Sequence, residues 1–284
     1  MEENIITSVQ NARIKHVVAL QQKSSLRREE GLFVVEGQRE IEHCLACGYE
    51  VVEVYKRSQE PEVRSQKSGV RSQEPEVRSQ ESGVRREVEY LVSPQVYEKM
   101  AYRGSTEGMI AVVKCKDHQL SIVHYPLSIQ DNPLVVVLEG VEKPGNLGAI
   151  LRSADAANVD AVIVCDPLTD LYNPNLIRAS IGAVFTVPTA VCTSLECIAF
   201  LKERKINILT AQLQDSYEYY DYDMTGPTAI VMGTESTGLT QQWREAADAH
   251  IRIPMLGRLD SLNVSVSAAI LIYEAVRQRK ASAP

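Results

Sequence analysis

The sequence lacks the features that would place the protein in a membrane or outside the cell. No apolar run approaches the roughly 20 residues needed to cross a bilayer. The first residues lack the positively charged start and apolar core of a secretory signal. The six cysteines include one closely spaced pair, Cys44 and Cys47, without a second CxxC to complete a metal site. We therefore expect a cytoplasmic protein with reduced thiols, no membrane contact and no metal.

An overall excess of positive charge is also absent. The net charge of −7 and the pI near 5.4 disfavour a protein that coats nucleic acid by bulk charge, but they allow a local basic surface. The stretch 11–28 has no carboxylate and carries the apolar spacing of an amphipathic helix. A solvated helix face and an RNA contact explain its basic residues equally well; these are Arg13, Lys15, Lys23, Arg27 and Arg28.

The 284 residues suffice for one large domain or two ordinary ones. In the first half, strand-like segments at 31–37 and 51–55 flank a helical pattern at 38–47, which predicts a β-α-β unit with parallel strands. The pattern stops at 57–84, where a 14-residue sequence occurs twice with a single change. Its prolines, glycines and mixed charge, with one valine per seven residues, predict a disordered insertion rather than a coiled coil.

The second half alternates apolar segments with helical patterns. Strands that are apolar on both faces and alternate with helices predict a parallel sheet between two helical layers. Ligands of such sheets bind in the loops beyond the carboxyl ends of the strands. The predicted strands are 134–138, 161–164, 184–187, 207–211 and 228–232, and the predicted helices are 148–157, 174–181 and 194–205.

The first of three candidate loops runs from Glu139 to Arg152. Its glycines miss the GxGxxG spacing, which disfavours a Rossmann cofactor site. Asn146 lies at or near the start of the following helix. Arg152 lies in a helix otherwise lined by apolar residues, so its guanidinium needs an anionic partner. A phosphate or carboxylate ligand would serve, and the alternative is an internal pair with Asp155 or Glu139.

Two further loops are candidates, the first of them directly after the predicted strand 228–232. In 232–239, two glycines flank Glu235 and allow the backbone to approach a ligand closely. In 253–274, a polar turn with Ser261 and Asn263, both favoured N-cap residues, leads into an apolar helix. The positive end of that helix suits an anionic or oxygen-rich ligand, and the alternative is an ordinary capped core helix.

Taken together, the three loops resemble a known family. The segments NLGAILRSADA, GTESTGL and IPMLGRLDSLNVSVSAAILIYE resemble, in order and spacing, the signature motifs of the SpoU-type (TrmH-like) RNA ribose 2′-O-methyltransferases of the SPOUT class. The segment GLFVVEGQREIEHCLACGYEVVEVY resembles the family's N-terminal RNA-binding domain, which has a ribosomal-protein-like fold. The resemblance implies an α/β protein with an RNA-binding domain at 1–115, interrupted by the insertion at about 57–86. A linker at 116–132 and a parallel-sheet SPOUT domain with a deep trefoil knot at 133–284 would follow.

The resemblance also implies a ligand and an assembly. S-adenosyl-L-methionine would be the methyl donor, RNA the substrate, and a homodimer through the C-terminal domain the active form. The family's functional polar residues map onto Asn146, Arg152, Glu235, Ser261 and Asn263, and its cofactor contacts onto Ala211, Gly233, Ile253 and Leu262.

The three motifs contain no histidine, so the usual base at neutral pH is missing. The motif-one arginine has been proposed as the base in this family, but deprotonating an arginine at pH 7 costs roughly 8 kcal/mol or more. We therefore expect Arg152 to act as a cationic clamp on the substrate phosphate and on the developing alkoxide. Asn146 and Asn263 would orient backbone and ribose, and Glu235 would hold Arg152 or Asn146.

The RNA target stays open at this point. Large-subunit (23S type) ribosomal RNA is the first choice because of the two-domain layout, transfer RNA is the second, and a role in antibiotic resistance is a further alternative. Two other classes compete: a non-catalytic RNA-binding or ribosome-assembly factor that retains the fold, and an unrelated doubly wound nucleotide-binding enzyme. The absence of GxGxxG and Walker loops disfavours the latter.

Overall fold

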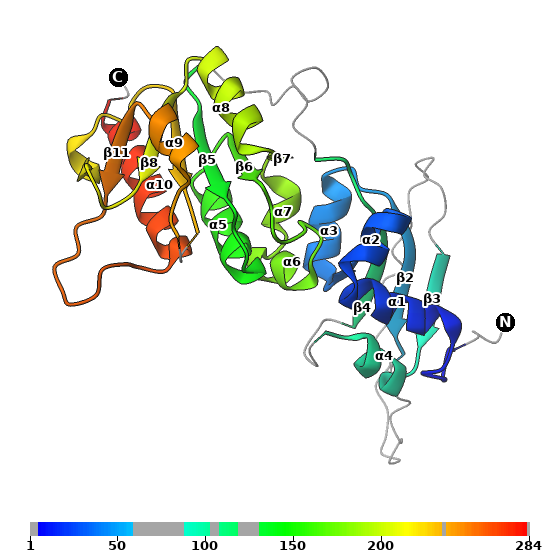
Figure 1. Ribbon diagram of the computed structural model, residues 1–284. Helices are drawn as coiled ribbons and strands as arrows, with labels where there is room; N and C mark the ends of the chain where they lie inside the picture. Colours follow the sequence, from blue (N-terminus) through cyan, green and yellow to red (C-terminus); the bar gives the residue numbers. More distant parts are fainter. Residues whose placement is uncertain (1–4, 59–87, 103–107, 119–130, 235–236, 283–284) are drawn as a thin grey trace, which may run out of the picture.

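The N-terminal half forms a four-stranded mixed sheet with helices around it. The computed structural model describes residues 5–58, 88–102, 108–118, 131–234 and 237–282. Figure 1 shows the N-terminal elements (blue to cyan) and the C-terminal elements (green to red) as two adjoining lobes. The N-terminal elements are α1 (Ala12–Gln22), α2 (Ser24–Glu30), β1 (Leu32–Glu36), α3 (Gln38–Ala46), β2 (Val51–Arg57), β3 (Val88–Val92), α4 (Pro94–Met100) and β4 (Met109–Lys114).

The basic stretch predicted as one helix forms two. The Asn11 side chain caps α1 by accepting from the backbone N–H of Arg13 at 2.9 Å. At Lys23 the backbone is extended (φ −114°, ψ 107°), which ends α1 and starts α2 in a new direction. The prediction of a continuous helix was therefore wrong at Lys23, because a spacing pattern does not reveal a single extended residue.

The strand order of this sheet is β1-β4-β2-β3. Both β1 and β2 are antiparallel to β4, so they run parallel to each other with β4 between them. The predicted β-α-β unit has the expected direction, although its strands are not hydrogen-bonded neighbours. Strand β2 extends to Arg57, the first residue of the repeat. The rest of the predicted disordered insertion, from residue 59 on, lies outside the described residues.

The C-terminal half forms a seven-stranded sheet in the order β7-β6-β5-β10-β8-β11-β9, and every neighbouring pair is parallel. This confirms the predicted parallel α/β architecture. Its strands are β5 (Leu134–Glu139), β6 (Ala161–Cys165), β7 (Thr189–Cys192), β8 (Asn207–Ala211), β9 (Tyr217–Glu218), β10 (Thr228–Met232) and β11 (Ala249–Arg252). Its helices are α5 (Pro144–Ala156), α6 (Pro174–Ser180), α7 (Ala183–Thr186), α8 (Ser194–Glu203), α9 (Gln241–Ala246), α10 (Val264–Ala281) and a short 3₁₀ turn, Tyr219–Asp221.

Two helical layers cover this sheet, as the central strand β5 illustrates. Val136 and Leu138 point toward the core shared with α5, α6, α7 and α10. Val135 and Val137 point toward a second core shared with α8 and α9. All four side chains are fully buried, which is why the strand is apolar at every position. Among the described residues, no helix is long and apolar enough to span a membrane.

One predicted strand in this half is a helix. Residues 184–187 are β-branched and aromatic, but they belong largely to α7, whose N-cap Gly182 has a left-handed backbone (φ 81°). Strand β7 begins only after Pro188. A short apolar run fits a buried helical turn as well as a strand. Here the segment forms a turn that buries Val184 and Phe185 and exposes Thr186.

An aromatic cluster joins the two halves. The ring of Phe33 in β1 stacks on Tyr172 with centroids 4.2 Å apart. Tyr49 contacts Phe185 of α7 edge to face at 5.2 Å. All four rings belong to the same buried core as α5 and α10, and α3 adjoins α7 in Figure 1. The interface between the halves is thus built like a domain core.

Two polar contacts accompany this cluster. Arg27, whose side chain is 4% exposed, donates two hydrogen bonds to Asp170, at 2.6 and 3.3 Å. In the segment after β4, His118 donates through Nδ1 to the carbonyl oxygen of Thr189 at 3.0 Å, and its Nε2 lies 2.9 Å from the Tyr172 hydroxyl. Burial lowers the pKa of His118 below its ordinary 6.5, although the Thr189 bond opposes the shift.

Candidate active site

The first predicted loop leaves the carboxyl end of β5 and starts α5. Lys143 is the N-cap and Pro144 the first helical residue, where its missing N–H costs nothing. Asn146 lies in the first turn. Gly148 packs against α6: a Cβ there would lie 2.6 Å from the Cβ of Ala179 and 2.7 Å from the carbonyl oxygen of Leu176. This glycine therefore serves helix packing rather than ligand approach.

The third loop meets the first at the start of α10. Asn263 is the N-cap of α10, and its Oδ1 accepts from the backbone N–H of Ser265 at 3.0 Å and from the Ser265 hydroxyl at 2.6 Å. Its Nδ2 donates to Oδ1 of Asn146 at 3.2 Å. Two helix N-termini that are 117 residues apart in the sequence are thus joined by their asparagine side chains.

The second loop follows β10, the strand next to β5. A Cβ at Gly233 would lie 2.4 Å from the carbonyl carbon and oxygen of Gly238, so the loop folds back closely on itself. Gly238 has a left-handed backbone (φ 69°) and its N–H bonds to the carbonyl oxygen of Thr234 at 3.1 Å. Glu235, a predicted site residue, lies outside the described residues.

A small pocket, with a volume of about 110 Å³, lies between these loops. It sits at the carboxyl ends of β5 and β10, where ligands of parallel sheets bind. Two predicted site residues, Asn146 and Gly233, line it. The lining residues are Val141, Glu142, Lys143, Asn146, Gly233, Thr234 and Val264.

Arg152 lies on the exposed side of α5, six residues after Asn146. The internal partners considered from the sequence are engaged elsewhere. Glu139 accepts from the Thr240 N–H and hydroxyl at 2.9 and 2.7 Å, and Asp155 accepts from Thr186 at 2.6 Å. Within the described ranges Arg152 forms no ion pair, which leaves its guanidinium for a ligand.

Glu139 has a structural role that was not predicted from the sequence. This carboxylate, 5% exposed, is fixed by Thr240, the N-cap of α9, and by the Ser194 hydroxyl at 3.2 Å. Trp243 in turn donates its indole N–H to Ser194 at 3.0 Å. The network ties α8 and α9 to the end of β5. An acidic residue directly after a fully apolar strand was the available signal for it.

The remaining predicted residues lie around this edge of the sheet without lining the pocket. Ala211 ends β8 next to β10 and pairs in register with Ile251 of β11, two residues before Ile253. Ser261 and Leu262 lie in the exposed connection between β11 and α10, which Figure 1 shows as an orange loop extending from the body. The structure thus brings Asn146, Asn263 and Gly233 together and leaves Ser261 and Leu262 at the periphery.

The predicted RNA-contacting residues divide into two groups. Arg27 is buried and held by Asp170 and two backbone carbonyls, so it is a structural residue. Arg13 is half exposed, pairs with Glu53 at 2.7 Å and lies over the ring of Tyr90 at 4.8 Å. The other three basic side chains are exposed; these are Lys15, Lys23 and Arg28.

The parallel α/β sheet, joined to a small mixed N-terminal domain, is the fold that this chain shares with solved SPOUT-class methyltransferases. Residues 133–273 match the family model described as the SpoU rRNA Methylase family, and residues 11–111 match the MRM3-like substrate binding domain. The chain belongs to the SpoU family.

Known proteins agree with this assignment. The 23S rRNA (guanosine-2'-O-)-methyltransferase RlmB of Vibrio parahaemolyticus is 39% identical over 184 residues, 64% of this chain and 74% of that protein. A crystal structure of an RNA 2'-O ribose methyltransferase matches with a TM-score of 0.78 and 35% identity, covering 97% of this chain and 99% of the other. The AdoMet-bound rRNA methyltransferase from Sinorhizobium meliloti matches with a TM-score of 0.80 and 25% identity over 98% of both chains.

Proposed function

We propose that this protein transfers a methyl group from S-adenosyl-L-methionine to a ribose 2′-hydroxyl of RNA, with 23S ribosomal RNA as the first candidate substrate. One observation carries the proposal: the 3.2 Å contact between Asn146 and Asn263, which joins two distant motifs beside the backbone of Gly233. Relatives at 36–40% identity are named for this reaction on 23S rRNA, and a matching structure binds AdoMet.

The residues present suit this cofactor. The tight approach of Gly233 to Gly238 leaves main-chain groups rather than side chains to face a ligand at the end of β10. Main-chain contacts at Gly233, with Ala211, Ile253 and Leu262 along the same edge of the sheet, would hold it. The cofactor supplies a methyl group on a positively charged sulfur, and the protein must supply orientation and charge for the ribose.

Arg152 is the residue that we assign to stabilising negative charge in the site. Its exposed guanidinium, without an ion pair among the described residues, can bind a substrate phosphate in a bidentate manner and stabilise negative charge that develops on the ribose oxygen. The proton would leave late, since a neutral arginine is too costly to form. Asn146 and Asn263 would orient the ribose, with Glu235 and Ser261 as further polar residues of the site.

The N-terminal domain is the part that we expect to select the RNA. Its exposed Lys15, Lys23 and Arg28 would contact phosphates, with Arg13 beside them, whereas Arg27 no longer belongs to this set. Each phosphate contact contributes about 0.7–0.9 to the slope of log K against log salt. Replacing Lys15 and Lys23 by glutamine should lower that slope by about 1–2 in a filter-binding titration. An unchanged slope would place the RNA elsewhere.

The homodimer and the trefoil knot implied by the family belong to this proposal as well. The connection before α10 and the first turn of α10 expose several apolar side chains, which an interface with another molecule would cover. These are Leu256 (96% exposed), Leu259 (76%) and Val266 (47%). A second copy of the chain on this face would bury them and place the two sites at the interface. The cell compartment we expect is the cytoplasm.

Calorimetry with S-adenosyl-L-methionine, followed by methyl transfer to total RNA, tests the proposal. We expect micromolar binding, and a loss of turnover of at least tenfold in Arg152→Lys, because lysine lacks the planar fork. Arg204→Lys is the matched control, since Arg204 lies over Phe200 at the end of α8. Near-normal turnover of Arg152→Lys would refute the clamp.

Two further results would redirect the assignment. RNA binding without any cofactor binding would favour the non-catalytic assembly factor. Mapping 2′-O-methyl sites in RNA from cells with and without the gene identifies the modified nucleotide; a change in transfer RNA instead of 23S rRNA would replace the first candidate by the second.

A further inference from the structure

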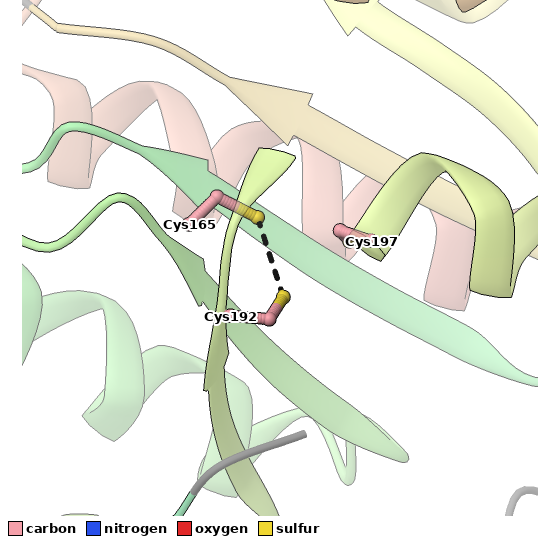
Figure 2. A group of neighbouring side chains, drawn as sticks. All are labelled: Cys165, Cys192 and Cys197. Carbon is pink, nitrogen blue, oxygen red and sulfur yellow. Dashed lines mark hydrogen bonds between the residues drawn. The ribbon is translucent and has the colours of Figure 1, made fainter. Parts of the chain in front are cut away.

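Three cysteines come together on the face of the C-terminal sheet that α8 and α9 cover. Cys165 ends β6 and Cys192 ends β7, and the two are register partners in the parallel ladder. Their sulfurs lie 4.0 Å apart and point toward each other (Figure 2). Cys197, from the first turns of α8, completes a group whose three sulfurs all lie within 4.8 Å of one another.

This group is separate from the proposed methyl-transfer site. Its side chains belong to the core beneath α8 and α9, together with Trp243 and Phe200. The pocket of Asn146 and Gly233 lies beside α5 and α10, which pack on the opposite face of the sheet. Any function of the three cysteines is therefore separate from the cofactor pocket.

The spacing of the three sulfurs suits one soft metal ion. Three thiolates about 2.3 Å from an ion in a plane lie roughly 4.0 Å apart, and in a tetrahedral site roughly 3.8 Å apart. The Cys165 and Cys192 sulfurs are already at the planar separation. Side-chain adjustments of less than about 1 Å would bring the third sulfur to the same distance.

The net charge of the site favours a divalent over a monovalent ion, and its exposure allows an ion to enter. Three thiolates and a divalent ion together carry a net charge of −1. With a monovalent ion the net charge would be −2, and a buried site disfavours the larger charge. The N-terminus of α8, ten residues long, favours negative charge, and Cys192 immediately precedes its N-cap Thr193. Cys165 and Cys197 are fully buried, and Cys192 retains 7% exposure on the edge strand, which offers an entry path.

From this geometry we propose that Cys165, Cys192 and Cys197 form a binding site for a thiophilic divalent cation of the Zn²⁺ type. The ion joins the ends of β6 and β7 to the start of α8. It thereby supports Ser194 and the Glu139 network at the end of β5. Sequence spacing could not reveal this site, because its ligands come from three elements and form no CxxC pair.

Cadmium is a suitable probe because thiolate coordination gives a charge-transfer absorption in the ultraviolet. The full chain would be reduced, stripped with a chelator and titrated with Cd²⁺, with Zn²⁺ as competitor. A background variant with serine at the other three cysteines, Cys44→Ser/Cys47→Ser/Cys115→Ser, removes thiols outside the group. We expect one Cd²⁺ per chain in both proteins, displaced by Zn²⁺, and a higher Tm when the ion is bound.

Replacing one ligand in the background variant, by Cys192→Ser or Cys197→Ala, should weaken Cd²⁺ binding by at least about 100-fold, because loss of a partner outside the ligand shell already costs about 10–100-fold. Circular dichroism checks that these variants fold. Native mass spectrometry of the unaltered protein, with or without added Zn²⁺, gives a second measurement that needs no substitution. No bound ion in the reduced unaltered protein, or unchanged binding in Cys197→Ala, would overturn the proposal. Formation of a Cys165–Cys192 disulfide without metal binding would overturn it as well.

Discussion

Replacing Gly148 by alanine tests whether the packing of α5 on α6 sets the position of the site. The new Cβ would lie 2.6 Å from the Cβ of Ala179, 2.7 Å from the carbonyl oxygen of Leu176 and 2.9 Å from the backbone N of Ser180. Two of these atoms are backbone, so no side-chain rotation relieves the contact. The helices would have to separate by about 0.8 Å to restore an ordinary contact of 3.4 Å.

Two opposing terms set the size of the effect. Alanine is a better helix residue than glycine by about 1 kcal/mol, and overpacking a tight interface costs about 1–3 kcal/mol. We expect overpacking to prevail, with a net loss of up to about 2 kcal/mol in the free energy of unfolding. The shift also acts on Asn146, two residues earlier. The 3.2 Å distance between Asn146 Oδ1 and Asn263 Nδ2 would lengthen beyond that of a hydrogen bond. Methyl transfer should therefore fall about 10–100-fold.

Urea denaturation and a methyl-transfer assay measure the two effects. Gly145→Ala is the matched control, because it lies in the first turn of α5 and its new Cβ would meet nothing within 4 Å. The control should be as stable as the parent, or more stable by up to about 1 kcal/mol. If Gly148→Ala were as stable and as active as Gly145→Ala, the proposed dependence of the site on this interface would be refuted.

Three further predictions concern the rest of the chain. Burial keeps the pKa of His118 below 6.5 in the folded protein, so on acidification the unfolded chain binds the proton first. The free energy of unfolding should therefore fall as the pH drops below about 6.5, by at most about 1.4 kcal/mol per pH unit. A His118→Gln variant should lose this part of the pH dependence in urea titrations. Asp170→Ala leaves the buried Arg27 cation without its carboxylate and should cost about 3 kcal/mol, the low end for a buried pair because Asp170 is 22% exposed. The double variant Arg27→Met/Asp170→Ala should recover part of this loss, and equal losses in both variants would argue against the pair. Deleting 71–84, one copy of the repeat, should leave folding and turnover unchanged, and a loss of soluble protein would show that the segment is structural.

The sequence was informative where one physical rule governs a segment. Strands buried on both faces must be apolar throughout, so β5, β8 and β10 were predicted within a residue or two of their observed ends. Short elements whose type depends on neighbours were not: α7 was predicted as a strand, and α9 and β11 were not predicted. Six residues of helix, or four of strand, carry too little periodicity to be distinguished from a turn.

The roles of side chains were also predictable where they depend on local sequence and not where they depend on the packing of distant elements. Sequence motifs placed Asn263 at a helix start and Asn146 near one, although α5 begins at Pro144, four residues before the predicted start at 148. The bond between the two asparagines depends on how the two helices pack. Arg27 shows the limit most clearly. In the sequence it is one of five similar cations, and only the proximity of Asp170, 143 residues away, makes it a structural residue. Partners from another domain leave no local trace in a sequence.

The shared core of the two halves changes how substrate selection should be understood. The linker predicted at 116–132 would suggest independent motion of the two halves. Phe33 of the N-terminal sheet nevertheless stacks directly on Tyr172, just before α6. Helix α6 contacts Gly148 of α5, and α5 carries Asn146 into the pocket. An unbroken series of buried contacts thus connects the proposed RNA-binding domain to the proposed site. The distance between bound RNA and methyl donor would then be fixed by packing, so the enzyme would select RNAs whose folded shape presents a ribose at that distance.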